Sequence, residues 1–339
     1  MRALVLTDGK PVLVPDRATP KPAPGEALIR PTRMGVCATD IELCKGYMGF
    51  AGVLGHEFAG VVEAVGNKAD KDRVGQRVVG EINCVCGKCD LCKAGLRSHC
   101  RERTVLGIAG RDGCFAEAFV LPVANLHAVP ENIDDDHAVF AEPLAAALQV
   151  VRQLKIEGRP FITVLGDGRL GLLCAQVLAK LNATVRVVGK HEAKLRLAEK
   201  WNIPARLLED VGLRKDQDIV VDTTGSSTGL GTAMQMVRPR GTIVMKTTVA
   251  PGSTPGSNNS GAERSGTSDV LPLDLSPLVI DEINLIGSRC GPFREALRVL
   301  SSGEVDVMSL VSRRMRLGDG VDVLRAANQR GMLKVLLEP

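Results

Sequence analysis

The chain has 339 residues, of which 45% are hydrophobic and 24% charged, and its formal net charge is +4. The length predicts two domains. The composition excludes collagen-like, coiled-coil and disordered proteins, and the small, dispersed charge argues against nucleic-acid binding. No apolar window of about 18 residues is present, which argues against a membrane span.

Short strands dominate the first 140 residues of the predicted structure. They are expected at 2–7, 26–32, 58–65 and 77–81, where β-branched residues are frequent and Gly, Pro and Asp separate the segments. The opening apolar run is too short for the core of a signal peptide. We therefore expect a cytoplasmic protein whose cysteines are reduced.

From about residue 138 the pattern changes to strands that alternate with helices. Strands are expected at 161–165, 185–188, 219–221 and 242–245, and helices at 143–154, at 192–201 and between the first two of these strands. This alternation indicates a parallel sheet. A helix at 293–301 and a strand at 333–337 close the chain.

Five of the ten cysteines lie between positions 84 and 100. Cys86, Cys89 and Cys92 follow one another at three-residue steps, and Cys100 comes after seven further residues. Three thiolates at this spacing wrap one side of a small ion, and a fourth closes a tetrahedron. Such a shell leaves no position for water, so we predict a structural zinc.

Two alternatives to this zinc fit the cysteines. One is a set of unrelated core cysteines, and the other is an iron–sulfur cluster, which uses cysteines at the same step. Bacterial ferredoxins have a shorter final gap and a following proline, whereas Arg101 follows Cys100 here. Zinc is therefore favoured, and Cys84 is left out of the site.

A second, scattered set of ligands lies outside this cluster. It comprises Cys37, the pair His56-Glu57 on a turn that enters a strand, and Glu142 where the first region ends. One cysteine, one histidine and one or two glutamates can form an open zinc site with room for water or a substrate oxygen. Each residue alone is weak evidence for a metal site, because a single buried cysteine or surface glutamate usually has no ligand role.

A glycine-rich turn follows the strand at 161–165 and opens a helix. Its sequence fits G-x-G-x-x-G, in which the glycines allow a pyrophosphate to approach and the helix N-terminus favours its charge. The segment therefore predicts a dinucleotide site. Its candidate residues are Gly166, Gly168, Arg169, Leu170 and Gly171.

The choice of dinucleotide depends on the next turn. Gly189 stands where an NAD-binding fold commonly has an acidic residue for the ribose 2′-hydroxyl. A missing carboxylate removes repulsion, and Lys190 is placed to neutralise a 2′-phosphate, so NADP is favoured over NAD. The alternative is that Lys190 is a solvated turn residue. Further candidates for this site are His191, Thr223 and Thr248.

Together these motifs resemble the zinc-dependent medium-chain alcohol and polyol dehydrogenases, over nearly the whole chain and in the same order. The resemblance implies an α/β fold with a GroES-like, β-rich catalytic domain and a Rossmann domain with a doubly wound parallel sheet. The catalytic domain is expected at 1–143 and 289–339, with the zinc lobe at 84–100, and the Rossmann domain at 144–288.

The resemblance also implies roles for the scattered ligands. The catalytic cysteine of the family falls on Cys37, its Gly-His-Glu motif on His56 and Glu57, and its third ligand position on Glu142. A glutamate there is similar to the sorbitol, glucose and threonine dehydrogenase branch. Which of the two glutamates binds zinc directly stays open. The metal is expected to act as a Lewis acid on the substrate oxygen.

Three further residues take roles from the same resemblance. Thr39 is expected to relay the alcohol proton, Asp40 to orient His56 through its other ring nitrogen, and Lys194 to contact the ribose. Thr39 and Asp40 also fit a plain role as turn-capping residues. Where some relatives have a relay histidine, this chain has Glu42.

These observations predict an oxidoreductase that acts on CH–OH groups. It would transfer hydride between a polyol, sugar or secondary alcohol and NADP or NAD. The alternative is a non-catalytic zinc- and nucleotide-binding protein, against which the complete ligand set argues. We expect a small-molecule substrate, a homodimer or homotetramer, and no nucleic-acid or membrane partner.

The segment 250–269, with fifteen of twenty residues Gly, Ser, Thr, Pro or Asn, is expected to be a surface loop whose deletion changes thermal stability little.

Overall fold

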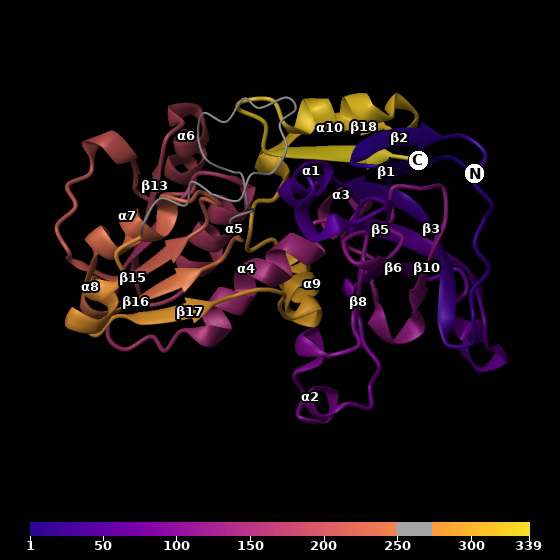
Figure 1. Ribbon diagram of the computed structural model, residues 1–339, viewed down its shortest axis with the longest axis horizontal. Helices are drawn as coiled ribbons and strands as arrows, with labels where there is room; N and C mark the ends of the chain where they lie inside the picture. Colours follow the sequence, from indigo (N-terminus) through magenta and orange to yellow (C-terminus); the bar gives the residue numbers. More distant parts are fainter. Residues whose placement is uncertain (249–272) are drawn as a thin grey trace, which may run out of the picture. The chain divides into compact units, whose positions relative to one another are not determined.

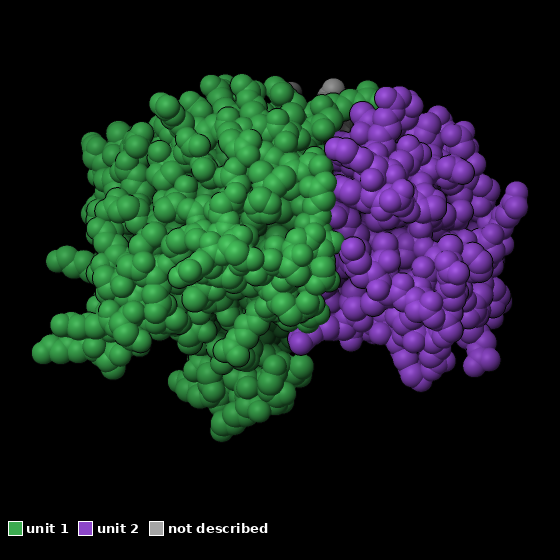
Figure 2. All heavy atoms as spheres, turned by 180° about the vertical axis from the view of Figure 1, so that it is seen from behind, with its two compact units in different colours: residues 1–146, 290–339 green, residues 147–289 purple. Residues whose placement is uncertain are grey.

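The computed structural model describes residues 1–248 and 273–339, so the predicted loop at 250–269 lies outside the described residues. The chain divides into two compact units, shown in separate colours in Figure 2. The first comprises Met1–Ala146 and Cys290–Pro339, and the second Ala147–Arg289. No helix in the described part of the chain is both long and apolar enough to cross a membrane.

The main sheet of the first unit combines both ends of the chain. Within the described residues its strands follow the order β11-β6-β5-β3-β19-β18, and β10 also pairs with β3. The pairs are antiparallel except β18 with β19. The strands are β3 (Glu26–Gly35), β5 (Glu57–Val65), β6 (Arg77–Gly80), β10 (Phe119–Pro122), β11 (Leu126–Ala128), β18 (Val311–Arg316) and β19 (Lys334–Glu338).

Two small sheets and several helices complete this unit. One sheet contains β1 (Ala3–Thr7), β2 (Lys10–Val14) and β4 (Gly52–Val53), and the other contains β7 (Asn83–Cys84), β8 (Thr104–Leu106) and β9 (Gly110–Arg111). Between β7 and β8 the chain forms a lobe that carries α2, seen below the strands in Figure 1. The helices are α1 (Ala38–Cys44), α2 (Asp90–Lys93), α3 (Asp135–Ala138), α9 (Phe293–Ser301) and α10 (Val321–Ala327). Helix α4 (Ala141–Gln153) begins in this unit and ends in the second.

The second unit contains a parallel sheet, as the alternating strands and helices predict. Among the described residues its order is β14-β13-β12-β15-β16-β17. Chain order therefore reverses between β12 and β15, the switch point at which doubly wound sheets bind ligands. The elements are β12 (Phe161–Leu165), α5 (Arg169–Leu178), β13 (Thr184–Gly189), α6 (Glu192–Lys200), β14 (Ala205–Leu207), β15 (Gln217–Asp222), α7 (Gly229–Met236), β16 (Val237–Met245), α8 (Ser276–Ile280) and β17 (Asn284–Gly287).

Candidate active site

Three side chains from two segments converge in the first unit. Cys37 directly precedes α1, His56 lies in the turn before β5, and Glu57 is the first residue of β5. Their ligand atoms all lie within 4.8 Å of one another. His56 and Glu57 are buried. A thiolate, an imidazole and a carboxylate at this spacing fit a zinc ion with one open coordination position.

Asp40 positions two of these residues at once. It is the third residue of α1, and its Oδ2 accepts the backbone N–H of Cys37 at 2.8 Å, which caps the helix. Its Oδ1 lies 3.4 Å from Nδ1 of His56 and 3.3 Å from the backbone nitrogen of Gly55. A buried carboxylate behind a ligating imidazole fixes the orientation of the ring.

Acidic side chains act on the imidazole of this site. Burial acts to lower the pKa of His56, but Asp40 and then Cys37 raise it, so that the pKa lies well above its ordinary value. Asp40 and Glu57 are both fully buried. A buried imidazole and carboxylate beside a thiol supply the donor atoms that zinc prefers, which supports the assignment of a metal site.

A buried lysine that was not predicted from the sequence enters this site. Lys334, the first residue of β19, is fully buried, and its Nζ is ion-paired with Oε2 of Glu57. The ammonium also lies 5.3 Å from the centre of the Phe140 ring. Burial lowers the pKa of Lys334 to about 8, and Cys37 and Asp40 oppose that effect. A lysine at the start of the apolar run Val-Leu-Leu is the one sequence signal of this role.

Glycine at position 35 makes room for the ion pair. Gly35 ends β3, where it faces Leu336 of β19. A Cβ atom on Gly35 would lie 2.6 Å from both Oε2 of Glu57 and Nζ of Lys334. Any larger residue would therefore displace the pair, so the strand needs glycine here.

The remaining predicted residues of this site occupy different positions. Thr39 lies beside the ligands, and its hydroxyl oxygen is 3.7 Å from Sγ of Cys37. Glu142 lies in the first turn of α4 and is not in the group formed by Cys37, His56 and Glu57. Glu42 forms an ion pair with Lys45 at 2.8 Å.

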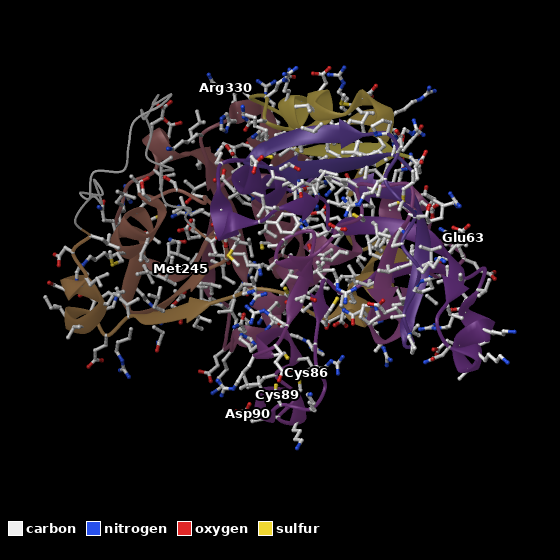
Figure 3. All side chains as sticks on the ribbon, turned by 45° about the vertical axis from the view of Figure 1, so that its right-hand side comes forward. Glu63, Cys86, Cys89, Asp90, Met245 and Arg330 are labelled. Carbon is white, nitrogen blue, oxygen red and sulfur yellow. The ribbon has the colours of Figure 1, made fainter. Side chains whose placement is uncertain are left out.

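The four cysteines of the lobe form a second group of ligands. The four Sγ atoms lie within 4.8 Å of one another and belong to Cys86, Cys89, Cys92 and Cys100. Figure 3 shows the first two of these residues on the lobe beside Asp90. The Cys100 sulfur is 3.5 Å from that of Cys86 and 3.9 Å from that of Cys89. Backbone N–H groups, with that of Arg101 first, lower the pKa of Cys89 to about 6. The lobe therefore fits a closed tetrathiolate zinc site.

Replacing one of these cysteines tests the lobe. Cys100→Ser is expected to remove about one zinc ion per chain and to lower the melting temperature by more than about 5 °C, because three thiolates cannot close the shell. Metal analysis and thermal denaturation measure both effects. The control is Cys84→Ser, whose thiol is buried but lies outside the group, so that variant should keep its zinc. Wild-type protein with no metal in the lobe would contradict the assignment.

The predicted nucleotide residues lie at the carboxyl ends of strands in the second unit. The turn at 166–171 follows β12, Gly189 ends β13, and Thr223 follows β15. The Thr223 hydroxyl donates to the carbonyl oxygen of Leu165 at 3.0 Å and thus ties two of these strand ends together. Lys190 and Thr248 are exposed, and Arg169, His191 and Lys194 are partly buried.

Comparison with known proteins identifies relatives of this chain. Residues 23–131 match the family model of the alcohol dehydrogenase GroES-like domain. The chain is 35% identical to an L-threonine 3-dehydrogenase of Streptomyces avermitilis, over 66% of this chain and 70% of that one. It is 26% identical to a sorbitol dehydrogenase of Halalkalibacterium halodurans, over 100% and 99% of the two chains.

A solved structure shares the fold over the full length. It is described as a zinc-binding dehydrogenase from Sinorhizobium meliloti bound to NADP, with 27% identity, a TM-score of 0.86 and coverage of 100% of this chain and 99% of that one. The predicted resemblance and the α/β fold with GroES-like and Rossmann parts are confirmed. The chain therefore belongs to the zinc-dependent medium-chain alcohol and polyol dehydrogenases, a family of oxidoreductases.

Proposed function

We propose that this enzyme oxidises a secondary alcohol of a polyol, sugar or hydroxy compound with NADP in preference to NAD. The observation that carries the proposal is the convergence of Cys37, His56 and Glu57. Asp40 accepts the backbone N–H of Cys37 and lies beside Nδ1 of His56. Relatives named for sorbitol and L-threonine support a small hydroxylated substrate. A panel of polyols, sugars and secondary alcohols, assayed with both cofactors, tests it.

The residues divide the chemistry between them. Cys37, His56 and Glu57 would hold zinc, which supplies Lewis-acid activation of the alcohol oxygen while the nicotinamide accepts hydride. We assign Glu57 rather than Glu142 as the third ligand, because Glu57 belongs to the converging group. Asp40 orients His56 and fixes Cys37. The Thr39 hydroxyl would relay the proton that leaves the alcohol, accepting it while giving its own proton towards the ribose of the cofactor.

The proton relay can be tested at Thr39. Thr39→Val keeps the shape of the side chain and removes the hydroxyl, so we expect kcat to fall by about 10²- to 10⁴-fold with little change in dinucleotide affinity. Steady-state rates and cofactor titration measure the two quantities. Thr39→Ser, which retains a hydroxyl, should recover most of the rate. A Thr39→Val enzyme with near-normal kcat would exclude the relay.

Cofactor preference follows from the end of β13. Gly189 offers no carboxylate side chain to the ribose, and the exposed Lys190 follows it. A 2′-phosphate gains a charge-assisted contact of about 1.5–3 kcal/mol from one lysine. We therefore expect kcat/KM to be at least about tenfold higher with NADP, and Lys190→Ala to remove that difference. Lys200→Ala, at the far end of α6, is the control. A wild type that favours NAD would contradict this assignment.

We further propose a homodimer or homotetramer in the cytoplasm. The edge strand β17 and the preceding helix α8 expose apolar side chains, among them Val279 at 80% and Ile280 at 77%. Exposed apolar groups beside an unpaired strand edge favour association with a second copy. Light scattering of the purified chain measures the oligomeric state.

A further inference from the structure

An aspartate inside the glycine-rich turn reaches the neighbouring strand end. Asp167 stands between Gly166 and Gly168, and it is only 6% exposed. Its Oδ2 accepts the backbone N–H of Lys190 at 2.7 Å and that of His191 at 2.6 Å. Both carboxylate oxygens also lie 3.1 Å from Nδ1 of His191. One carboxylate therefore holds the segment that connects β13 to α6.

The same carboxylate fills the space beside Gly189. A Cβ atom on Gly189 would lie 2.5 Å from Cβ and 2.5 Å from Oδ2 of Asp167. Real side chains do not approach so closely, so position 189 cannot carry the customary acidic residue while Asp167 is present. Glycine at position 189 therefore does not leave this strand end without a carboxylate, because Asp167 supplies one from another turn.

The Asp167 carboxylate is not available to bind two ribose hydroxyls. Two backbone donors and the His191 ring already engage it, and its side chain is 8% exposed. A ribose-binding acid must instead present free acceptor oxygens to the sugar. These hydrogen bonds of Asp167 go to residues that directly precede α6.

We propose that Asp167 is a positioning residue for cofactor choice, which holds residues 189–191 so that Lys190 presents its ammonium to the 2′-phosphate of NADP. This inference rests on the proposed function, since it concerns the same nucleotide site. Without the acceptor, the N–H groups of Lys190 and His191 lose their partner and the start of α6 relaxes. Only the phosphorylated dinucleotide then loses a contact, because NAD has no group for Lys190 to neutralise.

Asp167→Ala and Asp167→Asn provide the first test. Titration of the zinc-loaded enzyme with NADPH and NADH gives two dissociation constants, and their ratio reports preference independently of overall stability. We expect the preference for NADPH to fall about tenfold in Asp167→Ala and to stay within about threefold of wild type in Asp167→Asn, whose amide oxygen still accepts both N–H groups. An unchanged ratio in Asp167→Ala, or an equal loss for both cofactors, would overturn the inference.

The control is an aspartate with similar contacts near the amino-terminal ends of the strands in the same sheet. Asp218, near the start of β15, accepts the backbone N–H of Phe161 at 2.7 Å and pairs with Arg238 at 2.7 Å. Asp218→Ala should therefore lower stability without changing the NADPH:NADH ratio. A change of that ratio in Asp218→Ala would show that the readout follows general loosening of the unit, and the inference would fail.

A second test uses the contact between positions 167 and 189. Gly189→Asp alone is expected to weaken both cofactors, because the new side chain meets Asp167. In Asp167→Gly/Gly189→Asp the collision is gone and the carboxylate moves to the customary place, so NADH binding should recover at least about tenfold over the single Gly189→Asp variant. Equal effects of Gly189→Asp in both backgrounds would overturn the inference. A wild type that prefers NADH would refute the proposed cofactor and with it this role of Asp167, whereas a wild type that prefers NADPH, with an unchanged ratio in Asp167→Ala, would refute the inference alone.

Discussion

Cys37→Ser or His56→Ala is expected to abolish turnover while the affinity for dinucleotide stays unchanged. Both residues belong to the converging ligand group of the first unit, whereas the nucleotide residues lie in the second. Loss of Lewis-acid activation removes several kcal/mol of transition-state stabilisation, or at least about 10³-fold in rate. Zinc should fall from about two ions per chain, one for each ligand group, to about one. Rates, metal analysis and NADPH titration measure the three quantities.

A neighbouring thiol gives the matched control for Cys37. Cys44 is the last residue of α1, partly buried and outside the ligand group. Cys44→Ser should therefore keep both zinc ions and its rate to within about a factor of three, since removal of a single non-ligating sulfur alters packing only modestly. If Cys37→Ser retains full zinc content and a normal rate, the converging group is not the catalytic site.

The sequence predicts part of the regular structure of the second unit, whereas β14, α7, α8 and β17 were not expected. β12, β13, α6 and the end of β16 lie within a few residues of the expected segments, because buried apolar strands and amphipathic helices carry strong periodic signals.

The strands β2 and β18 were not predicted. β18 reads Val-Ser-Arg-Arg-Met-Arg and is largely exposed at the edge of its sheet, so pairing with β19 rather than its own pattern makes it a strand.

The two metal groups differ in how far the sequence predicts them. The lobe cysteines lie within one short segment, so their spacing alone indicates a shared ion. Cys37 precedes α1 and His56 precedes β5, so they meet only in the fold, and grouping them from the sequence required the family resemblance. Lys334 and Asp167 were missed, because a charged residue is normally read as solvent-exposed and only the fold shows that it is buried against an opposite charge or backbone donors.

The largest stability effect is expected at Lys334. Lys334→Met keeps the length of the side chain but leaves the fully buried Glu57 carboxylate without its cationic partner. Breaking a buried pair in this way costs about 3–5 kcal/mol of unfolding free energy. Urea denaturation of the metal-free protein measures the loss. Zinc bound by Glu57 would supply positive charge at the same carboxylate, so the loss should be smaller in the zinc-loaded enzyme.

A double variant separates the charge from the packing. Glu57→Gln/Lys334→Met removes both charges, so it should recover most of the stability lost in Lys334→Met, which a double-mutant cycle reads as a large coupling energy. The exposed pair Lys45–Glu42 is the control, and Lys45→Met should change stability by less than about 1 kcal/mol. Additive effects at Glu57 and Lys334 would mean that the two groups do not interact, and Gly35 would then have no pair to make room for. A strong coupling would instead show that the ion pair between Lys334 and Glu57 links the stability of β19 to the metal site.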